Sequence, residues 1–298
     1  MKILLATDGS ECSEGAAKFL TCLDLTPDDE ITVFHAVSWV PFLYDRESYI
    51  ETLKEIRKEI APKILDSALE TLKPCGAKLS TAIVDGAAGY YIVDAAVKSG
   101  MDLIVMGARG VKGIQSLFIG SVTKSVSAAA TIPVLVTKLP VCGRSKRMKI
   151  LAATDGSEYS VAAGKLLTMI PFPSSAEVTV MNVIWSDFSD IPQRFVLEVN
   201  ERIKAVVAET RSAEVREAER ITEDAKKLLA AKFANVSVMT KVGDPSAEIL
   251  KAAETIQSDL IAVGCRGLRG IKGMLGSVSR NIVAHSKCAV LIGKQCSP

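Results

Sequence analysis

The sequence predicts an α/β protein of two tandem domains, each a doubly wound, five-stranded parallel sheet with strand order 3-2-1-4-5. Short aliphatic runs alternate along the chain with segments of helical periodicity, which is typical of parallel sheets covered by helices on both faces. The 298-residue chain also repeats itself once. A repeat of about 150 residues indicates domain duplication, because the units of solenoid proteins are far shorter. We expect domains at residues 1–140 and 148–298, with a linker around 139–148.

The repeat is clearest at the first strand of each half. The segment Lys2–Glu11 (KILLATDGSE) returns as Lys149–Glu158 (KILAATDGSE), 147 residues later. From Gly86 and Gly243 onward the offset is 157, so the second half carries ten additional residues before that point. At the end of a later glycine-rich loop the offset falls to 156, so this loop is one residue shorter in the second half.

In the first half, strands and helices are expected in alternation. The expected strands are residues 2–6, 30–37, 78–84, 102–106 and 134–136, and the expected helices are residues 13–23, 47–72, 90–99 and 121–130. Pro62 predicts a kink or a break in the second helix, because proline lacks the amide N–H and clashes with the preceding turn. The continuous apolar run Leu103–Met106 predicts a strand buried on both faces.

The second half repeats these elements and adds a long insertion. Asp244 is expected to cap a helix whose first position is Pro245. The insertion lies in residues 193–233, and its middle, residues 209–220, is densely charged. A solvated helix explains it more simply than a partner-binding arm. Its apolar face is expected to comprise Phe195, Val199, Ile203, Val206 and Val207.

The composition is that of a globular protein without a large net charge of either sign. Basic and acidic residues nearly balance, 36 against 34, so neither nucleic acid nor a membrane surface is an expected partner. The seven cysteines are odd in number and form no CxxC pair, which favours reduced thiols over a disulfide framework. No apolar run is long enough to span a bilayer. We therefore expect a cytoplasmic location.

A glycine pattern follows the fourth strand of each half. It reads GARG, nine residues, then Gly120-Ser121 in the first half, and GCRG, eight residues, then Gly276-Ser277 in the second. Glycine allows a ligand to approach the backbone closely. A helix that begins at Gly-Ser offers unpaired N–H groups and the positive end of its dipole, which suits phosphate. The pattern predicts a bound nucleotide, with two places to hold it.

Two common nucleotide-binding designs do not fit this pattern. A Walker-A loop needs Lys-Ser/Thr directly after its last glycine, where this chain has Ser-Val. A dinucleotide fingerprint would follow the first strand, where the chain reads Ala-Thr-Asp-Gly-Ser. What remains is a site shared between the end of the first strand, with Asp8, and the end of the fourth, with Gly107. Those ends meet at the topological switch point of a 3-2-1-4-5 sheet.

These motifs resemble those of the universal stress proteins, and the likeness covers the chain as two tandem copies. The resemblance rests on ATDGS after the first strand, a Gly-Asp-Pro-like turn before the third helix, and the glycine pattern. It implies the ATP-binding branch of that family, an adenine-nucleotide-hydrolase-like fold, and ATP as the ligand, with magnesium as a further option. Members of that family pair their last strands between subunits, so the resemblance also implies an intramolecular pseudo-dimer.

Carried over by position, the resemblance assigns a nucleotide site to each half. In the first half, the adenosine end would involve Ala6, Thr7, Asp8 and, beside the base, Val37; the ribose and phosphates would involve Met106, Gly107, Arg109 and Gly110; the phosphate tail would involve Gly120, Ser121, Val122 and Thr123. In the second half, the matching residues are Ala153, Thr154, Asp155, Val183, Val263, Gly264, Arg266, Gly267, Gly276, Ser277, Val278 and Ser279. The shorter second loop departs from the family pattern, which leaves phosphate binding there open.

Simpler structural roles compete for several of these residues. Asp8 and Asp155 each precede a glutamate by three positions, so both fit a capping role as well as a ligand contact. Ser121 and Ser277 also fit as N-caps. The two histidines, His35 and His285, are expected to be structural, because no cluster of metal-binding residue types surrounds them.

The residues identify no general base or nucleophile, so we expect no catalytic residues and no metal site. The favoured hypothesis is an ATP-binding stress-response protein whose occupancy changes its shape or its protein partners, none of which the sequence identifies. A slow ATPase or phosphotransferase that uses the same pocket is the first alternative. An interaction scaffold with one vestigial crevice is the second. Homodimerisation through the charged insertion also stays open.

Overall fold

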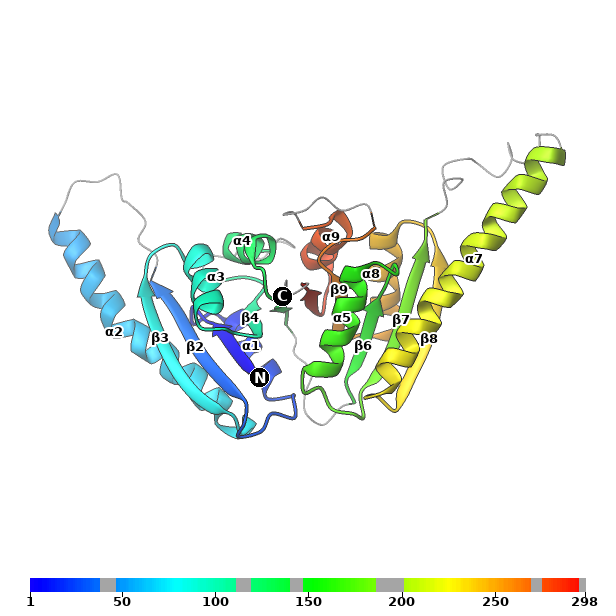
Figure 1. Cartoon of the computed structure of the whole chain (residues 1–298). Coiled ribbons are helices and arrows are strands. Elements are labelled where there is room, and N and C mark those ends of the chain that lie inside the picture. The colour runs from blue at the N-terminus through cyan, green and yellow to red at the C-terminus, as the bar shows by residue number, and fades with distance from the viewer. Residues whose placement is uncertain (38–46, 111–118, 140–146, 186–200, 269–274, 295–298) are drawn as a thin grey trace.

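The computed structural model describes residues 1–37, 47–110, 119–139, 147–185, 201–268 and 275–294. These residues form a ten-stranded sheet in the order β3-β2-β1-β4-β5-β10-β9-β6-β7-β8 (Figure 1). Each half therefore contains a five-stranded sheet in the predicted order, and the fold class is confirmed. The predicted linker lies largely outside the described residues.

The first half closely follows the predicted elements. Its strands are β1 (Lys2–Ala6), β2 (Glu30–Val37), β3 (Lys78–Asp85), β4 (Leu103–Gly107) and β5 (Val134–Thr137), and its helices are α1 (Glu11–Leu20), α2 (Glu47–Leu72), η1 (Lys73–Cys75), α3 (Ala88–Lys98) and α4 (Ser121–Ala129). The helix α2 continues through Pro62, so of the two predicted outcomes, a kink or a break, the break is wrong.

The second half repeats the same order. Its strands are β6 (Lys149–Ala153), β7 (Glu177–Ile184), β8 (Asn235–Val242), β9 (Leu260–Gly264) and β10 (Ala289–Gly293), and its helices are α5 (Glu158–Met169), α7 (Glu201–Ala230), α8 (Pro245–Ile256) and α9 (Ser277–His285). Asp244 caps α8 by accepting a hydrogen bond from the Ala247 N–H, with Pro245 at the first position, as predicted.

The long helix α7 carries the charged part of the insertion. Figure 1 shows its amino-terminal end projecting beyond the sheet. Arg220 pairs with Glu217 and Asp224 on its exposed surface. Of its predicted apolar face, Ile203 and Val206 are exposed whereas Val207 is buried; Phe195 and Val199 lie outside the described residues. The predicted helix is present, but it is solvated on one side only, because Ala218, Thr222 and Leu229 are buried against the rest of the second half.

Two core layers cover the sheet. Alternate residues of a strand face opposite sides, so Ile3 and Leu5 pack with α1 and α2, whereas Leu4 and Ala6 pack with α3 and α4. The same division holds in the second half, with α5 and α7 on one face and α8 and α9 on the other. In the described part of the chain, no helix is long and apolar enough to cross a membrane.

The two halves are joined edge to edge. Strands β5 and β10 pair antiparallel, with Leu135 opposite Leu291. Lys138, after β5, donates to the Ser286 carbonyl at the end of α9, at 2.6 Å. Its counterpart Lys294, after β10, donates to the Ser127 carbonyl of α4, at 2.9 Å. This seam makes the chain an intramolecular pseudo-dimer, because each half supplies the strand and the lysine that the other receives.

Candidate functional site

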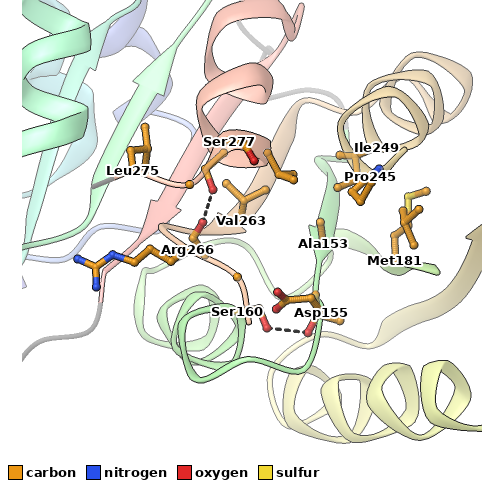
Figure 2. A pocket seen from close by; sticks show the side chains of 17 residues that line it. Ala153, Asp155, Ser160, Met181, Pro245, Ile249, Val263, Arg266, Leu275 and Ser277 are labelled. Carbon is orange, nitrogen blue, oxygen red and sulfur yellow. Dashed lines mark hydrogen bonds between the residues drawn. The ribbon is translucent and has the colours of Figure 1, made fainter. Parts of the chain in front are cut away.

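A cavity of about 420 Å³ opens at the carboxyl ends of β6 and β9, and we call it the second crevice. Its volume lies within the range of small-molecule sites. It is lined by Ala153, Thr154, Asp155, Ser160, Met181, Val183, Pro245, Ile249, Val263, Gly264, Arg266, Gly267, Leu275, Gly276, Ser277, Val278 and Ser279 (Figure 2). All of the second-half residues predicted for a nucleotide site are among them. We use the name first crevice for the residues at the matching repeat positions of the first half.

A carboxylate joins the two strand ends that form each crevice. Asp155 Oδ1 accepts hydrogen bonds from the N–H and the hydroxyl of Ser157, at 3.0 and 2.6 Å. Its Oδ2 accepts from the Leu268 N–H, after β9, at 3.1 Å. In the first half, Asp8 accepts from Ser10 in the same way, and a Cβ on Gly110 would collide with Asp8 Oδ2. The predicted meeting of the first and fourth strand ends is therefore confirmed.

The helix caps differ from the predicted ones. Ser10 and Ser157 cap α1 and α5 by accepting from the N–H groups three residues later, so the capping role proposed for Asp8 and Asp155 is wrong. The aspartates instead orient these capping serines. Each capping serine lies at the turn between the first strand and the first helix, so α1 begins two residues earlier than expected.

The predicted phosphate helices begin at glycine. Gly120 and Gly276 are the N-cap residues of α4 and α9, with no side-chain cap, so Ser121 and Ser277 occupy the first helical position and are not N-caps. The Gly120 N–H donates to the Ala108 carbonyl at 2.8 Å, and Gly276 makes the equivalent bond to Cys265. The following main-chain N–H groups lack partners within the helix and are the donors that an anion can use.

Thr123 and Ser279 hold these helices to the sheet. The Ser279 hydroxyl donates to the Gly264 carbonyl at 2.6 Å, and the Thr123 hydroxyl donates to the Gly107 carbonyl at 3.0 Å. Both side chains are buried. Because each hydroxyl proton is committed to a carbonyl, these two residues offer a phosphate tail their main chain rather than their side chain.

The residue predicted beside the base is displaced by one position in the first half. Glu30 and Glu177 begin β2 and β7, so Val37 corresponds to Ile184, and Ala36 corresponds to Val183. Val183 lines the cavity and packs in the same core layer as Ala36. Side chains alternate along a strand, so Val37 lies on the opposite face of the sheet from the crevice.

Two buried polar residues that the sequence analysis did not place in the site support its floor. His35 Nδ1 lies 2.8 Å from the Thr7 carbonyl, and the Asn182 amide donates to the Thr154 carbonyl at the same distance. His35 and Asn182 occupy equivalent positions of the two repeats. Because the carbonyl only accepts, Nδ1 of His35 carries the proton. The structural role expected of His35 is confirmed, and the offset of 147 residues would have revealed its counterpart.

A tyrosine of α5 fixes the orientation of the Arg266 side chain. Its Nη1 donates to the Tyr159 hydroxyl at 3.0 Å, and its guanidinium carbon lies 5.1 Å from the centre of the Tyr159 ring. Figure 2 shows the side chain directed away from Asp155 and Ala153. Arg266 is among the lining residues of the crevice, and Tyr159 holds its guanidinium on the side away from Asp155. Tyr159 was not singled out from the sequence.

Within the described ranges, no group of three His, Cys, Asp or Glu side chains is placed to hold a metal ion. The second crevice combines apolar side chains with main-chain donors. An apolar slot between Met181, Val183 and Ile249 leads to the amino-terminal end of α9, where main-chain N–H groups gather. Gly264 allows β9 to lie against α5, since a Cβ there would fall 2.7 Å from the carbonyl carbon of Tyr159.

Comparisons with known proteins agree with the repeat. A model described as the universal stress protein family matches residues 1–138 and 146–294. A universal stress protein of Mycolicibacterium smegmatis is 26% identical over 97% of this chain and 96% of its own length. One from Methanocaldococcus jannaschii is 34% identical over 47% of this chain and 82% of its own length. The crystal structure of a universal stress protein from Archaeoglobus fulgidus covers 99% of this chain and 96% of its own, with a TM-score of 0.64 and 22% identity, which supports the fold.

Proposed function

This chain belongs to the universal stress protein family, and we propose that it binds adenine nucleotides, ATP foremost, as a regulatory protein of the stress response with little or no catalysis. The observation that carries the proposal is the second crevice. There, a slot of apolar side chains ends at the uncapped amino terminus of α9. A flat apolar base and an anionic tail match these two ends.

The energetics require several contacts to act together. Micromolar affinity corresponds to about 8 kcal/mol. A helix dipole contributes only about 0.3–1 kcal/mol per charge. Burial of the base between Met181, Val183 and Ile249 adds apolar area, and the main-chain donors at the start of α9 add hydrogen bonds to charge. The proposed affinity therefore comes from the crevice as a whole rather than from one residue.

The first crevice has the same main-chain framework, so we extend the proposal to it. Gly120 begins α4 as Gly276 begins α9, and each makes the same hydrogen bond back to the loop after the fourth strand. Filling of both crevices, a cytoplasmic location and regulation of a protein partner are parts of the proposal that rest on the family and on this likeness.

The carboxylate of the second crevice is already hydrogen-bonded. Both oxygens of Asp155 accept hydrogen bonds, from Ser157 and from Leu268. A water-activating base needs a free acceptor oriented towards the γ-phosphate. This engagement favours a nucleotide sensor over the alternative of an ATPase. Phosphate release measured over hours separates the two, because turnover of about 1 s⁻¹ would refute the sensor.

The experiment that tests nucleotide binding is the release of bound ligand from freshly purified protein. The chain is denatured, the released small molecules are identified by mass spectrometry, and moles of nucleotide are counted per mole of chain. The expected result is an adenine nucleotide. Absence of any nucleotide, together with no rise in melting temperature when Mg-ATP is added, would remove the proposal.

A further inference from the structure

We propose that one repeat position, Cys12 in the first half and Tyr159 in the second, decides whether a crevice selects a triphosphate tail. The proposal rests on the nucleotide binding proposed above and deepens it. In the second crevice, Tyr159 keeps the arginine charge away from the phosphates, so triphosphate and monophosphate bind similarly. In the first crevice that tether is absent, so Arg109 reaches the tail and favours the triphosphate.

The two residues are true counterparts in the fold. Each is the second residue of the first helix of its half, 147 positions apart. Each also packs under the glycine that ends the fourth strand: a Cβ on Gly107 would lie 2.6 Å from the carbonyl carbon of Cys12, and a Cβ on Gly264 would lie 2.7 Å from that of Tyr159. Their side chains therefore start from equivalent places beside the arginine two residues beyond each glycine.

In the second half, the tether has two components. The Tyr159 hydroxyl accepts a hydrogen bond from Arg266 Nη1, and the tyrosine ring lies beneath the guanidinium, a cation–π arrangement. The result is visible in Figure 2, where Arg266 extends away from Asp155. Arg266 also lies near Lys294 at the seam: burial lowers the pKa of Lys294, and the neighbouring positive charge of Arg266 contributes to this.

In the first half, the thiol of Cys12 provides neither a ring face nor a hydroxyl at the end of a long side chain. Arg109 begins beside the seam as well, because its charge contributes to the lowered pKa of Lys138, whose main cause is burial. The difference between the halves is therefore the tether and not the starting position. An arginine without the tether is able to rotate towards an anion at the start of α4, where charge-assisted hydrogen bonds are strong.

The expected size of the effect follows from the charge involved. A hydrogen bond to a charged group is typically worth tenfold or more in affinity, about 10- to 100-fold. A monophosphate ends nearer the ribose than a triphosphate does, so it gains less from a distal guanidinium. The ratio of ATP affinity to AMP affinity is therefore the quantity that the tether changes.

The test exchanges the two residues in the full-length chain and measures each crevice separately. Gly120→Val or Gly276→Val closes one crevice, and the affinities of the other for ATP and for AMP are measured by calorimetry. Tyr159→Cys is expected to raise the ATP-to-AMP preference of the second crevice by about tenfold or more. Cys12→Tyr is expected to lower that of the first by a similar factor. Tyr159→Phe keeps the ring and removes the hydroxyl, so an intermediate ratio is expected.

Arg266→Ala added to Tyr159→Cys provides the control, because it must return the ratio to that of the unaltered second crevice. A merely structural role of Tyr159 would weaken both nucleotides together and leave the ratio unchanged. An unchanged ratio in Tyr159→Cys, with both nucleotides still bound, overturns this proposal and leaves nucleotide binding intact. Failure of the unaltered protein to bind either nucleotide overturns the proposed function itself.

Discussion

The two halves of the chain build one framework with different side chains. The floor of the first crevice is held by His35 and that of the second by Asn182, yet both bond to the carbonyl of the preceding strand's threonine. Thr123 and Ser279 likewise make the same bond. The halves differ instead at Cys12 and Tyr159, the position that we propose determines where the neighbouring arginine lies. Different residues can supply the same hydrogen-bond donor to a main-chain carbonyl, so the framework is kept. The position of the arginine charge, in contrast, depends on a single side chain.

The largest expected effect tests whether the halves share their helix–strand packing. Gly107→Val would force a side chain into the backbone of Cys12, and Gly264→Val into that of Tyr159. Since backbone cannot move aside cheaply, we expect each to destabilise its half by about 3 kcal/mol in urea unfolding. Tolerance in one half alone would show that the two helices are packed differently.

The next effect separates the phosphate ends from that packing. A Cβ on Gly120 meets its nearest atoms at 3.5 Å, an ordinary contact, so Gly120→Val should fold. Mg-ATP at a hundredfold its dissociation constant stabilises a domain by about 2.7 kcal/mol. We expect Gly120→Val to remove this gain from the first half, and Gly276→Val from the second, in thermal unfolding. A variant that keeps the full gain would show that the corresponding phosphate site is misassigned.

A smaller effect concerns the lysines at the seam. Burial lowers the pKa of Lys138 from 10.5 to about 8, so the folded chain releases a proton that the unfolded chain retains between these values. Stability contributed by this group therefore rises as the pH increases from about 8 to about 10.5. We expect a rise of about 1–3 kcal/mol in urea unfolding, and Lys138→Met should flatten it. An equal rise in that variant would assign the effect to another group.

The smallest effect compares two helix ends. Gln257 ends α8 at φ 54°, where its counterpart Gly100 has φ 59°. A side chain in this left-handed region is strained, so Gln257→Gly should stabilise the second half by about 1 kcal/mol. Gly100→Ala should destabilise the first half by a similar amount, because an alanine is strained at this backbone conformation. Its Cβ would meet nothing within 4 Å, so no steric clash adds to the effect. Urea midpoints check both, and a lowered midpoint for Gln257→Gly or a raised midpoint for Gly100→Ala would contradict this explanation.

The fold was predictable because the repeat and the strand–helix alternation are properties of the chain alone. The paired strand ends followed from the topology, which brings Asp8 to Gly110. What failed was detail that depends on tertiary contact. The register of β2 places Ala36, and not the predicted Val37, on the face of the sheet that corresponds to the crevice, since an apolar run does not reveal which face of a strand meets the crevice. The orientation of Arg266 depends on a ring more than a hundred residues away, and no local pattern indicates it.

The antiparallel pairing of β5 with β10 lies within a single polypeptide. In a dimer of identical subunits, every substitution would occur in both subunits, so both crevices would change together. In this chain a substitution alters one half only, so each crevice can acquire its own affinity. A titration of this protein should then yield two classes of binding, with the weaker class extending the range of nucleotide concentrations to which one molecule responds.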